Sequence, residues 1–208
     1  MKRKVSVSFL SSKNVIDDLI DLEATDTDFI HVDEMDGKFV KNKNTQFKIL
    51  DRMSYVLQKR LDVHLMVKNP SKLIEKYITL NTEYITLHVE LGDKILDYYN
   101  QIKSYGIKCG LAINPDTDIE SIKDYLDYID LILVMSVTPG AGGQSFMEET
   151  TNRILKIKDM IKKKKILISV DWGINSDTVN KLSGADIVVS GSFVIKSEDF
   201  QTQIDKLR

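Results

Sequence analysis

The sequence predicts a single parallel (β/α)₈ barrel, the TIM-barrel type, spanning residues 1–208. Eight short runs rich in β-branched residues alternate with helical patterns along the chain. Such alternation is typical of parallel βαβ units, and eight units in this length favour a closed barrel over an open, doubly wound sheet. No linker, proline-rich segment or change of composition divides the chain.

Each expected element follows from its residue pattern. The expected strands are Lys4–Ser8, Phe29–Val32, Leu61–Met66, Tyr84–Val89, Ile107–Ile113, Leu131–Val137, Ile166–Val170 and Ile187–Ser190. Between them, apolar residues recur at helical spacing in Val15–Leu22, Lys72–Leu80 and Arg153–Ile161. Lysines 162–165 suit the carboxyl end of the last of these helices, where the helix dipole favours cations. The connection from Gly37 to Arg60 is the longest and least regular.

Composition limits the class of protein. Hydrophobic residues make up 42% of the chain, enough for a substantial core, and the formal net charge of −2 gives no basic surface for nucleic acid. Cys109 is the single cysteine, so no intrachain disulfide can form, and we expect a buried thiol in a reducing cytoplasm. No apolar stretch is long enough for a membrane span. We therefore expect a cytoplasmic protein whose partners are small molecules or further copies of the chain.

Polar residues gather where the expected strands end. These residues are Ser8, His31, Asp33, His64, His88, Glu90, Asn114 and Asp171. In a barrel of this type the active site forms at the carboxyl ends of the strands. His31 and Asp33 are two residues apart in a strand, so their side chains share one face. The sequence therefore predicts one site at one rim of the barrel.

Four of these side chains form a candidate metal site. His31 and His64 supply two nitrogen ligands, and Asp33 and Asp171 supply two oxygens from well-separated strands. This set suits one divalent transition metal, Zn²⁺ or Fe²⁺ with Mn²⁺ or Co²⁺ as further candidates, and matches Mg²⁺ or Ca²⁺ poorly. Such a metal stabilises an enediolate oxygen. Two flanking carboxylates could remove a proton from one face of the adjacent carbon and return it on the other, which is epimerisation.

Glycine-rich turns after the last three strands indicate an anion site. They contain Gly140, Ala141, Gly142 and Gly143, then Gly173, and finally Gly191 with Ser192. Glycine lets backbone N–H groups approach an anion closely, and barrels often bind phosphate in the loops after strands 7 and 8. A phosphorylated substrate is therefore expected.

Longer motifs connect the chain to a known family. They are Ser8-Phe9-Leu10-Ser11, the ten residues from His31 to Val40, Asp62-Val63-His64-Leu65-Met66-Val67, His88-Val89-Glu90, Gly110-Leu111-Ala112-Ile113-Asn114-Pro115, the seven residues from Val134 to Gly140, and Gly191-Ser192. In order and spacing, over nearly its whole length, the chain resembles the ribulose-phosphate 3-epimerase family.

The resemblance implies roles for individual residues. One divalent metal would be bound by His31, Asp33, His64 and Asp171, with Asp33 and Asp171 as the acid/base pair on opposite faces of the sugar C3. Ser8 and His64 would contact substrate, and the glycine turns with Ser192 would surround the phosphate. Met35, Met66 and Met135 match methionines that pack around the reacting carbons, although ordinary core methionines explain them equally well. The family also tends to form homo-oligomers and belongs to the pentose phosphate pathway.

The chain departs from the family pattern at several positions. Trp172 follows Asp171 where the family usually has glycine. Two interpretations stay open: a pocket altered for another sugar phosphate, or a ring that points away. Glu34 replaces an apolar residue beside Asp33, and Lys41 and Val7 each replace a proline. None of these changes removes a metal ligand or an aspartate of the pair.

The function expected from the sequence is metal-dependent interconversion of D-ribulose 5-phosphate and D-xylulose 5-phosphate. An allulose-type hexulose 6-phosphate 3-epimerase is the alternative within the same class. A non-catalytic barrel that binds a sugar phosphate is the alternative of another class, but binding alone needs no paired aspartates. Orotidine-phosphate decarboxylases share the barrel, yet their Asp-x-Lys-x-x-Asp motif is absent from the chain.

Overall fold

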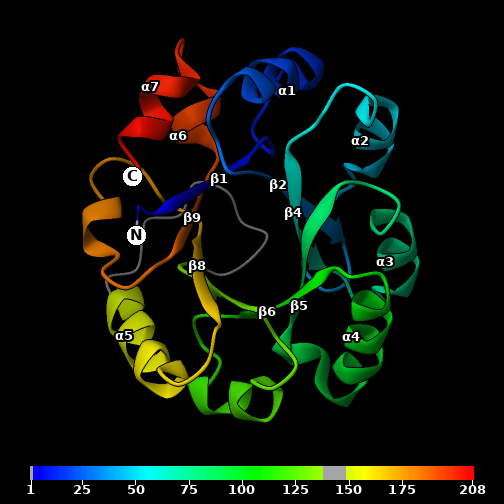
Figure 1. The fold of residues 1–208 in the computed structure, drawn as a ribbon, viewed down its shortest axis with the longest axis vertical. Helices are drawn as coiled ribbons and strands as arrows, with labels where there is room; N and C mark the ends of the chain where they lie inside the picture. Colours follow the sequence, from blue (N-terminus) through cyan, green and yellow to red (C-terminus); the bar gives the residue numbers. More distant parts are fainter. Residues whose placement is uncertain (1, 138–148) are drawn as a thin grey trace.

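A computed structural model describes residues 2–137 and 149–208. Eight parallel strands form a ring that closes where β1 pairs with β2, and the short β3 adds to β2 in the antiparallel sense. Helices surround this ring (Figure 1). The predicted (β/α)₈ barrel is confirmed.

The strands follow the chain around the barrel. Their bounds are β1 Lys4–Ser8, β2 Phe29–Asp36, β3 Lys43–Asn44, β4 Arg60–Met66, β5 Thr82–His88, β6 Lys108–Ile113, β7 Leu131–Met135, β8 Leu167–Asp171 and β9 Ile187–Ser190. Two predicted strands, Lys4–Ser8 and Ile187–Ser190, have the observed bounds, and the other six differ by up to four residues at one end or both. The largest difference is in β2, where pairing with β4 continues to Met35 and brings Asp33 inside the strand.

Helices connect successive strands. The α-helices are α1 Val15–Ala24, α2 Phe47–Met53, α3 Ser71–Tyr77, α4 Ile95–Ser104, α5 Glu149–Ile161, α6 Ser192–Ile195 and α7 Phe200–Asp205, and 3₁₀ helices η1 to η3 cover Val89–Lys94, Ile119–Tyr125 and Val179–Lys181. The predicted helix Arg153–Ile161 begins earlier, at Glu149, and Lys72–Leu80 ends earlier, at Tyr77. The irregular connection after Gly37 contains β3 and α2.

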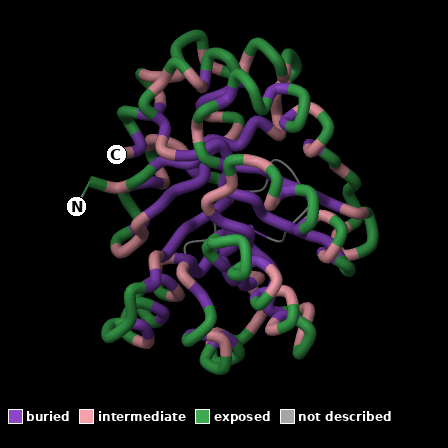
Figure 2. Tube along the Cα trace, turned by 45° about the vertical axis from the view of Figure 1, so that its right-hand side comes forward, coloured by how far each residue is buried: buried purple, intermediate pink, exposed green. Residues whose placement is uncertain are grey.

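The core has two parts. Most buried apolar residues lie between the strands and the helices, so burial follows the strands through the centre of the molecule (Figure 2). A smaller cluster, which includes Phe29, Tyr84, Leu133 and Met135, is formed by side chains of the other strand face, inside the ring. Because strand residues alternate between faces, the polar side chains that share this inner face are carried to the barrel mouth. Among the described residues, no helix is long and apolar enough to cross a membrane.

The thiol of Cys109 is fully buried on β6, as expected from the sequence. Burial raises the pKa of Cys109 to about 12, so the reactive thiolate is scarce at neutral pH. We predict that the native protein reacts slowly with an aromatic disulfide reagent and rapidly after unfolding in urea. The release of the coloured thiol measures both rates, and equal rates would contradict this placement of β6.

Candidate active site

Four side chains meet at the carboxyl end of the barrel. His31 and Asp33 come from β2, His64 from β4 and Asp171 from the last position of β8. Asp33 lies opposite His64 in the parallel register of β2 and β4, which brings these two together directly. All four residues are buried, with at most 4% of their surface exposed. The four predicted ligands are therefore adjacent.

The donor atoms of these residues could hold one metal ion. One ligand atom from each lies within 4.8 Å of all the others. The separations are 3.4 Å from His31 Nε2 to Asp33 Oδ1, 3.3 Å from His64 Nδ1 to Asp33 Oδ1, and 3.6 Å from His31 Nε2 to Asp171 Oδ2. Ligands at the usual 2.0–2.1 Å from a tetrahedral zinc ion are roughly 3.3 Å apart. His31 Nε2 and Asp171 Oδ2 are buried without a hydrogen-bond partner in the described part of the chain, as expected for atoms reserved for a ligand.

The electrostatics of this cluster favour a positive charge. Burial alone would lower the pKa of His31, but the Asp33 and Asp62 carboxylates raise it well above the usual histidine range. Burial opposes ionisation of Asp33, yet His31 and His64 lower its pKa far below the usual aspartate range. Burial raises the pKa of Asp171, and the nearby Asp33 carboxylate adds to the increase while His31 opposes it. A metal cation bound here would balance the negative charge of these carboxylates.

Further hydrogen bonds fix both imidazoles. His31 Nδ1 lies 2.9 Å from Asp62 Oδ2, which also accepts a hydrogen bond from the Ser6 hydroxyl. This bond leaves His31 Nε2 facing the cluster. A carboxylate behind a ligating histidine is the usual second layer of a metal site.

A second chain of bonds orients the other imidazole. His64 Nε2 lies 2.8 Å from His88 Nε2, and His88 Nδ1 lies 3.0 Å from Glu90 Oε2. With Glu90 as the acceptor, the proton order along the chain leaves His64 Nδ1 free of hydrogen. Burial also lowers the pKa of His64 to about 4. His64 is therefore a neutral imidazole with its lone pair directed at the cluster.

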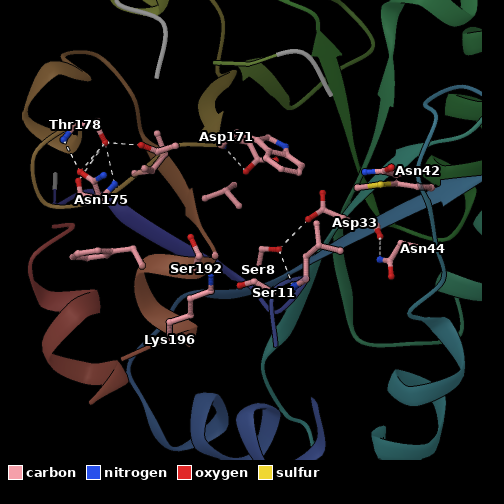
Figure 3. Close-up of a pocket in the computed structure, with 18 of the residues that line it drawn as sticks. Ser8, Ser11, Asp33, Asn42, Asn44, Asp171, Asn175, Thr178, Ser192 and Lys196 are labelled. Atoms are coloured by element: carbon pink, nitrogen blue, oxygen red, sulfur yellow. Dashed lines mark hydrogen bonds between the residues drawn. The ribbon is translucent and has the colours of Figure 1, made fainter. Parts of the chain in front are cut away.

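A cavity of about 1030 Å³ opens above the cluster. Asp33 and Asp171 line its floor together with Ser8, whose hydroxyl donates to Asp33 Oδ2 over 2.9 Å (Figure 3). Ser192 and Lys196 line another part of the wall. Pockets for small ligands usually fall between about 300 and 1,000 Å³, so a phosphorylated sugar fits.

Trp172 has an unusual backbone conformation beside Asp171. Its φ is 76°, a left-handed value that costs a non-glycine residue about 1–2 kcal/mol. Buried Ser136 stabilises this turn, because its N–H and hydroxyl both donate to the Asp171 carbonyl, at 3.1 and 2.7 Å. Trp172 lines the cavity, and its indole N–H is buried with no partner among the described residues. Both interpretations drawn from the sequence, an altered pocket and a ring that points away, stay predictions.

Comparisons with known proteins identify the family. A model described as the ribulose-phosphate 3-epimerase family matches residues 4–195. The chain is 40% identical to the Helicobacter pylori J99 protein named ribulose-phosphate 3-epimerase over 188 residues, 88% of this chain and 87% of that protein. It is 34% identical to the Bacillus subtilis protein of the same name, covering 99% of this chain and 98% of that protein.

The chain belongs to the ribulose-phosphate 3-epimerase family. It is therefore an enzyme of the isomerase class, as the sequence motifs predicted. Solved structures share the fold at low identity. The 3-hexulose-6-phosphate synthase from Salmonella typhimurium has a TM-score of 0.71 at 18% identity, with 98% of this chain and 96% of that one covered. A decarboxylase of 3-keto-L-gulonate 6-phosphate from Vibrio cholerae has a TM-score of 0.74 at 13% identity, with 100% and 96% covered.

The structure brings most of the predicted site residues of this epimerase-family chain together. Besides the four buried candidate ligands, Ser8, Met35, Trp172, Gly173, Gly191 and Ser192 line the cavity. Met66 and Met135 are buried, and neither is among the described lining residues. Gly140, Ala141, Gly142 and Gly143 lie outside the described residues.

Several residues of the site were not predicted from the sequence. Asp62 precedes His64 by two residues, so the shared strand face could have indicated it. His88 and Glu90 were expected at this rim, but not the hydrogen bonds that link them to each other and to His64. Lys43 and Lys196 line the cavity from segments far apart in the chain. No local pattern marks these two lysines.

We predict that a divalent metal stabilises the protein. Zn²⁺ at about 100 times its dissociation constant should add about 2.7 kcal/mol to the free energy of unfolding, measured as a higher melting temperature. His64→Ala, which removes a donor, should abolish the increase. Asp62→Asn keeps all four donors and should weaken binding about 10- to 100-fold. Asp159→Asn changes an exposed carboxylate on α5 and serves as the control. Equal metal content in all variants after dialysis would contradict this site.

Proposed function

We propose that the protein is a metal-dependent ketose-phosphate 3-epimerase that interconverts D-ribulose 5-phosphate and D-xylulose 5-phosphate. One observation carries the proposal: two buried aspartates from separate strands share one cluster, and their environments shift their pKa values in opposite directions. A carboxylate with a lowered pKa can act as the base, and one with a raised pKa can act as the acid. Together they can remove a proton from one face of a carbon and add one to the other face.

The proposed reaction uses the two aspartates in turn. The Asp33 carboxylate, held by the Ser8 hydroxyl, removes the proton from C3 of D-ribulose 5-phosphate. Electrons from the C3–H bond form the double bond of a 2,3-enediolate. Asp171 then donates a proton to the opposite face of C3 and yields D-xylulose 5-phosphate, and the roles exchange in the reverse direction. A divalent metal held by His31, Asp33, His64 and Asp171 would stabilise negative charge on the C2 oxygen.

The phosphate would lie across the cavity from this cluster. Gly173, Gly191 and Ser192 line that part of the wall and can offer backbone N–H groups. Lys196 adds a positive charge from an exposed position on the same wall. A non-catalytic sugar-phosphate sensor would need this half of the cavity but not the paired aspartates. Cytoplasmic location and homo-oligomeric assembly stay predictions from the sequence.

A hexulose 6-phosphate is the second candidate substrate, and Trp172 is the observation that favours it. The cavity volume admits either sugar phosphate. The choice therefore depends on the side chains of the wall. The Trp172 indole N–H, buried and unpaired in the described structure, can donate to a substrate hydroxyl.

We predict that Asp33→Asn and Asp171→Asn each lose epimerisation by about 10²- to 10⁴-fold, since each removes one proton-transfer group. Asp171→Asn should still exchange the C3 hydrogen of D-ribulose 5-phosphate with D₂O, because Asp33 remains. NMR of the recovered sugar detects this exchange. Asp186→Asn is the control, since that carboxylate binds the Ile168 N–H at the start of β8, far from the cluster. Wild-type turnover in either variant would refute the two-base mechanism.

We also predict that Trp172→Gly changes the preference between pentulose and hexulose phosphates. Glycine tolerates φ of 76° without strain, so the turn should persist while the indole is lost. Ratios of kcat/KM for the two substrates, from coupled assays, measure the effect. An unchanged ratio would show that Trp172 does not select the substrate.

A further inference from the structure

Glu34 is a buried carboxylate that the proposed reaction does not use. It follows Asp33 on β2, so its side chain lies on the other face of the strand, toward the helices. Only 1% of its surface is exposed. This face of a barrel strand ordinarily carries apolar residues, and a carboxylate at this depth persists only where donors satisfy it.

Three donors converge on one oxygen of this carboxylate. Glu34 Oε1 accepts hydrogen bonds from the backbone N–H groups of Gln46 and Phe47, at 2.8 and 2.9 Å. It also accepts one from the Tyr77 hydroxyl at 2.5 Å. Glu34 thereby binds the first N–H groups of α2, where Gln46 makes no capping bond with its own side chain. The Phe47 ring packs edge-on against Tyr77, with centroids 5.4 Å apart. The start of α2 is fixed to β2 and α3 together.

The segment held in this way binds the backbone of Asp33. The Asp33 N–H donates to Gln46 Oε1 over 2.9 Å, and the Asp33 carbonyl accepts from Asn44 Nδ2 over 2.7 Å. On this side of β2, the partner strand β1 ends at Ser8, opposite His31. The pairing of β1 with β2 therefore stops before Asp33. The side chains of Gln46 and Asn44 take the place of a strand there, because they bind the N–H and the carbonyl of Asp33.

We propose that Glu34 is a positioning residue that fixes Asp33 through the segment from Asn44 to Phe47. Glu34 holds the backbone at Gln46, and the Gln46 side chain holds Asp33 in line with His64 and Asp171. This inference rests on the proposed role of Asp33 as base and metal ligand. It adds a second requirement, that the base is held in place from outside the barrel by a side chain that does not contact the substrate.

A double-mutant cycle tests this role. Gln46→Ala removes the bond to Asp33 but leaves the N–H groups that Glu34 binds, and Glu34→Leu removes the oxygen that accepts all three hydrogen bonds while leaving a side chain of similar size. Each single variant should lower kcat about 10- to 100-fold, since small misplacement of a catalytic group has effects of this size, with KM unchanged. If Glu34 acts through Gln46, the double variant should be no slower than the slower single variant. Independent losses that multiply would overturn the proposal.

Two readouts do not depend on turnover. Amide hydrogen exchange at Asp33 should become faster in both variants, and Zn²⁺ affinity should fall. Tyr99→Phe is the matched control, because it removes an equally buried hydroxyl whose bond to the Gly110 carbonyl, 2.8 Å long, lies on another strand. It should lower the melting temperature without changing exchange at Asp33. Unchanged exchange in the Glu34 variant would overturn the proposal.

A wild-type protein that epimerises no ketose phosphate would instead refute the proposed function and leave the exchange and Zn²⁺ tests of Glu34 in force.

Discussion

The site depends on the confinement of two carboxylates and two imidazoles in one buried space. Such a group is unstable unless each member has a fixed partner and the net charge is balanced. The structure meets the first condition with hydrogen bonds from surrounding residues: Asp62 binds His31 and His88 binds His64. The Ser8 hydroxyl donates to the Asp33 carboxylate, and the Trp172 N–H donates to the Asp171 carboxylate. A cation held by the four donor atoms would meet the second condition. The parallel register of β2 and β4 makes both possible, because it places Asp33 opposite His64.

The sequence predicted the barrel well because its strands are buried on both sides and read as short apolar runs between turns. It predicted strand ends less well. Polar residues such as Asp33 fall inside β2 because pairing with β4 and β3, which no local pattern reveals, continues past the apolar run. The segment after Gly37 was left without elements for the same reason. The start of α2 is stabilised by Glu34, a residue twelve positions before Gln46 in the chain, rather than by a capping side chain of its own.

The candidate site, like the fold, could be predicted from the sequence only in part. The four residues of the cluster were predictable because histidine and aspartate at strand ends are conspicuous in a barrel. The Asp36 carboxylate shapes the turn after β2, since it accepts from the N–H groups of Lys38 and Phe39. The hydrogen bonds that surrounding residues make to the cluster were not predicted. Whether Asp62 binds a histidine or water depends on which strand lies beside it, and that is a property of the closed ring rather than of any single motif.

The two aspartates are held by different physical means, and this difference bears on their proposed roles. Asp33 is fixed within a strand, with both peptide groups bonded and its carboxylate bonded to Ser8. Asp171 ends its strand, and the next residue takes a strained left-handed turn that only surrounding contacts can maintain. Strain of this kind persists where a particular geometry is needed, and here Trp172 lines the cavity while its backbone N–H donates to Asp171 Oδ1 over 2.7 Å. The same turn therefore orients the carboxylate of Asp171, the proposed proton donor, and forms part of the cavity wall. A change at Trp172 would affect both.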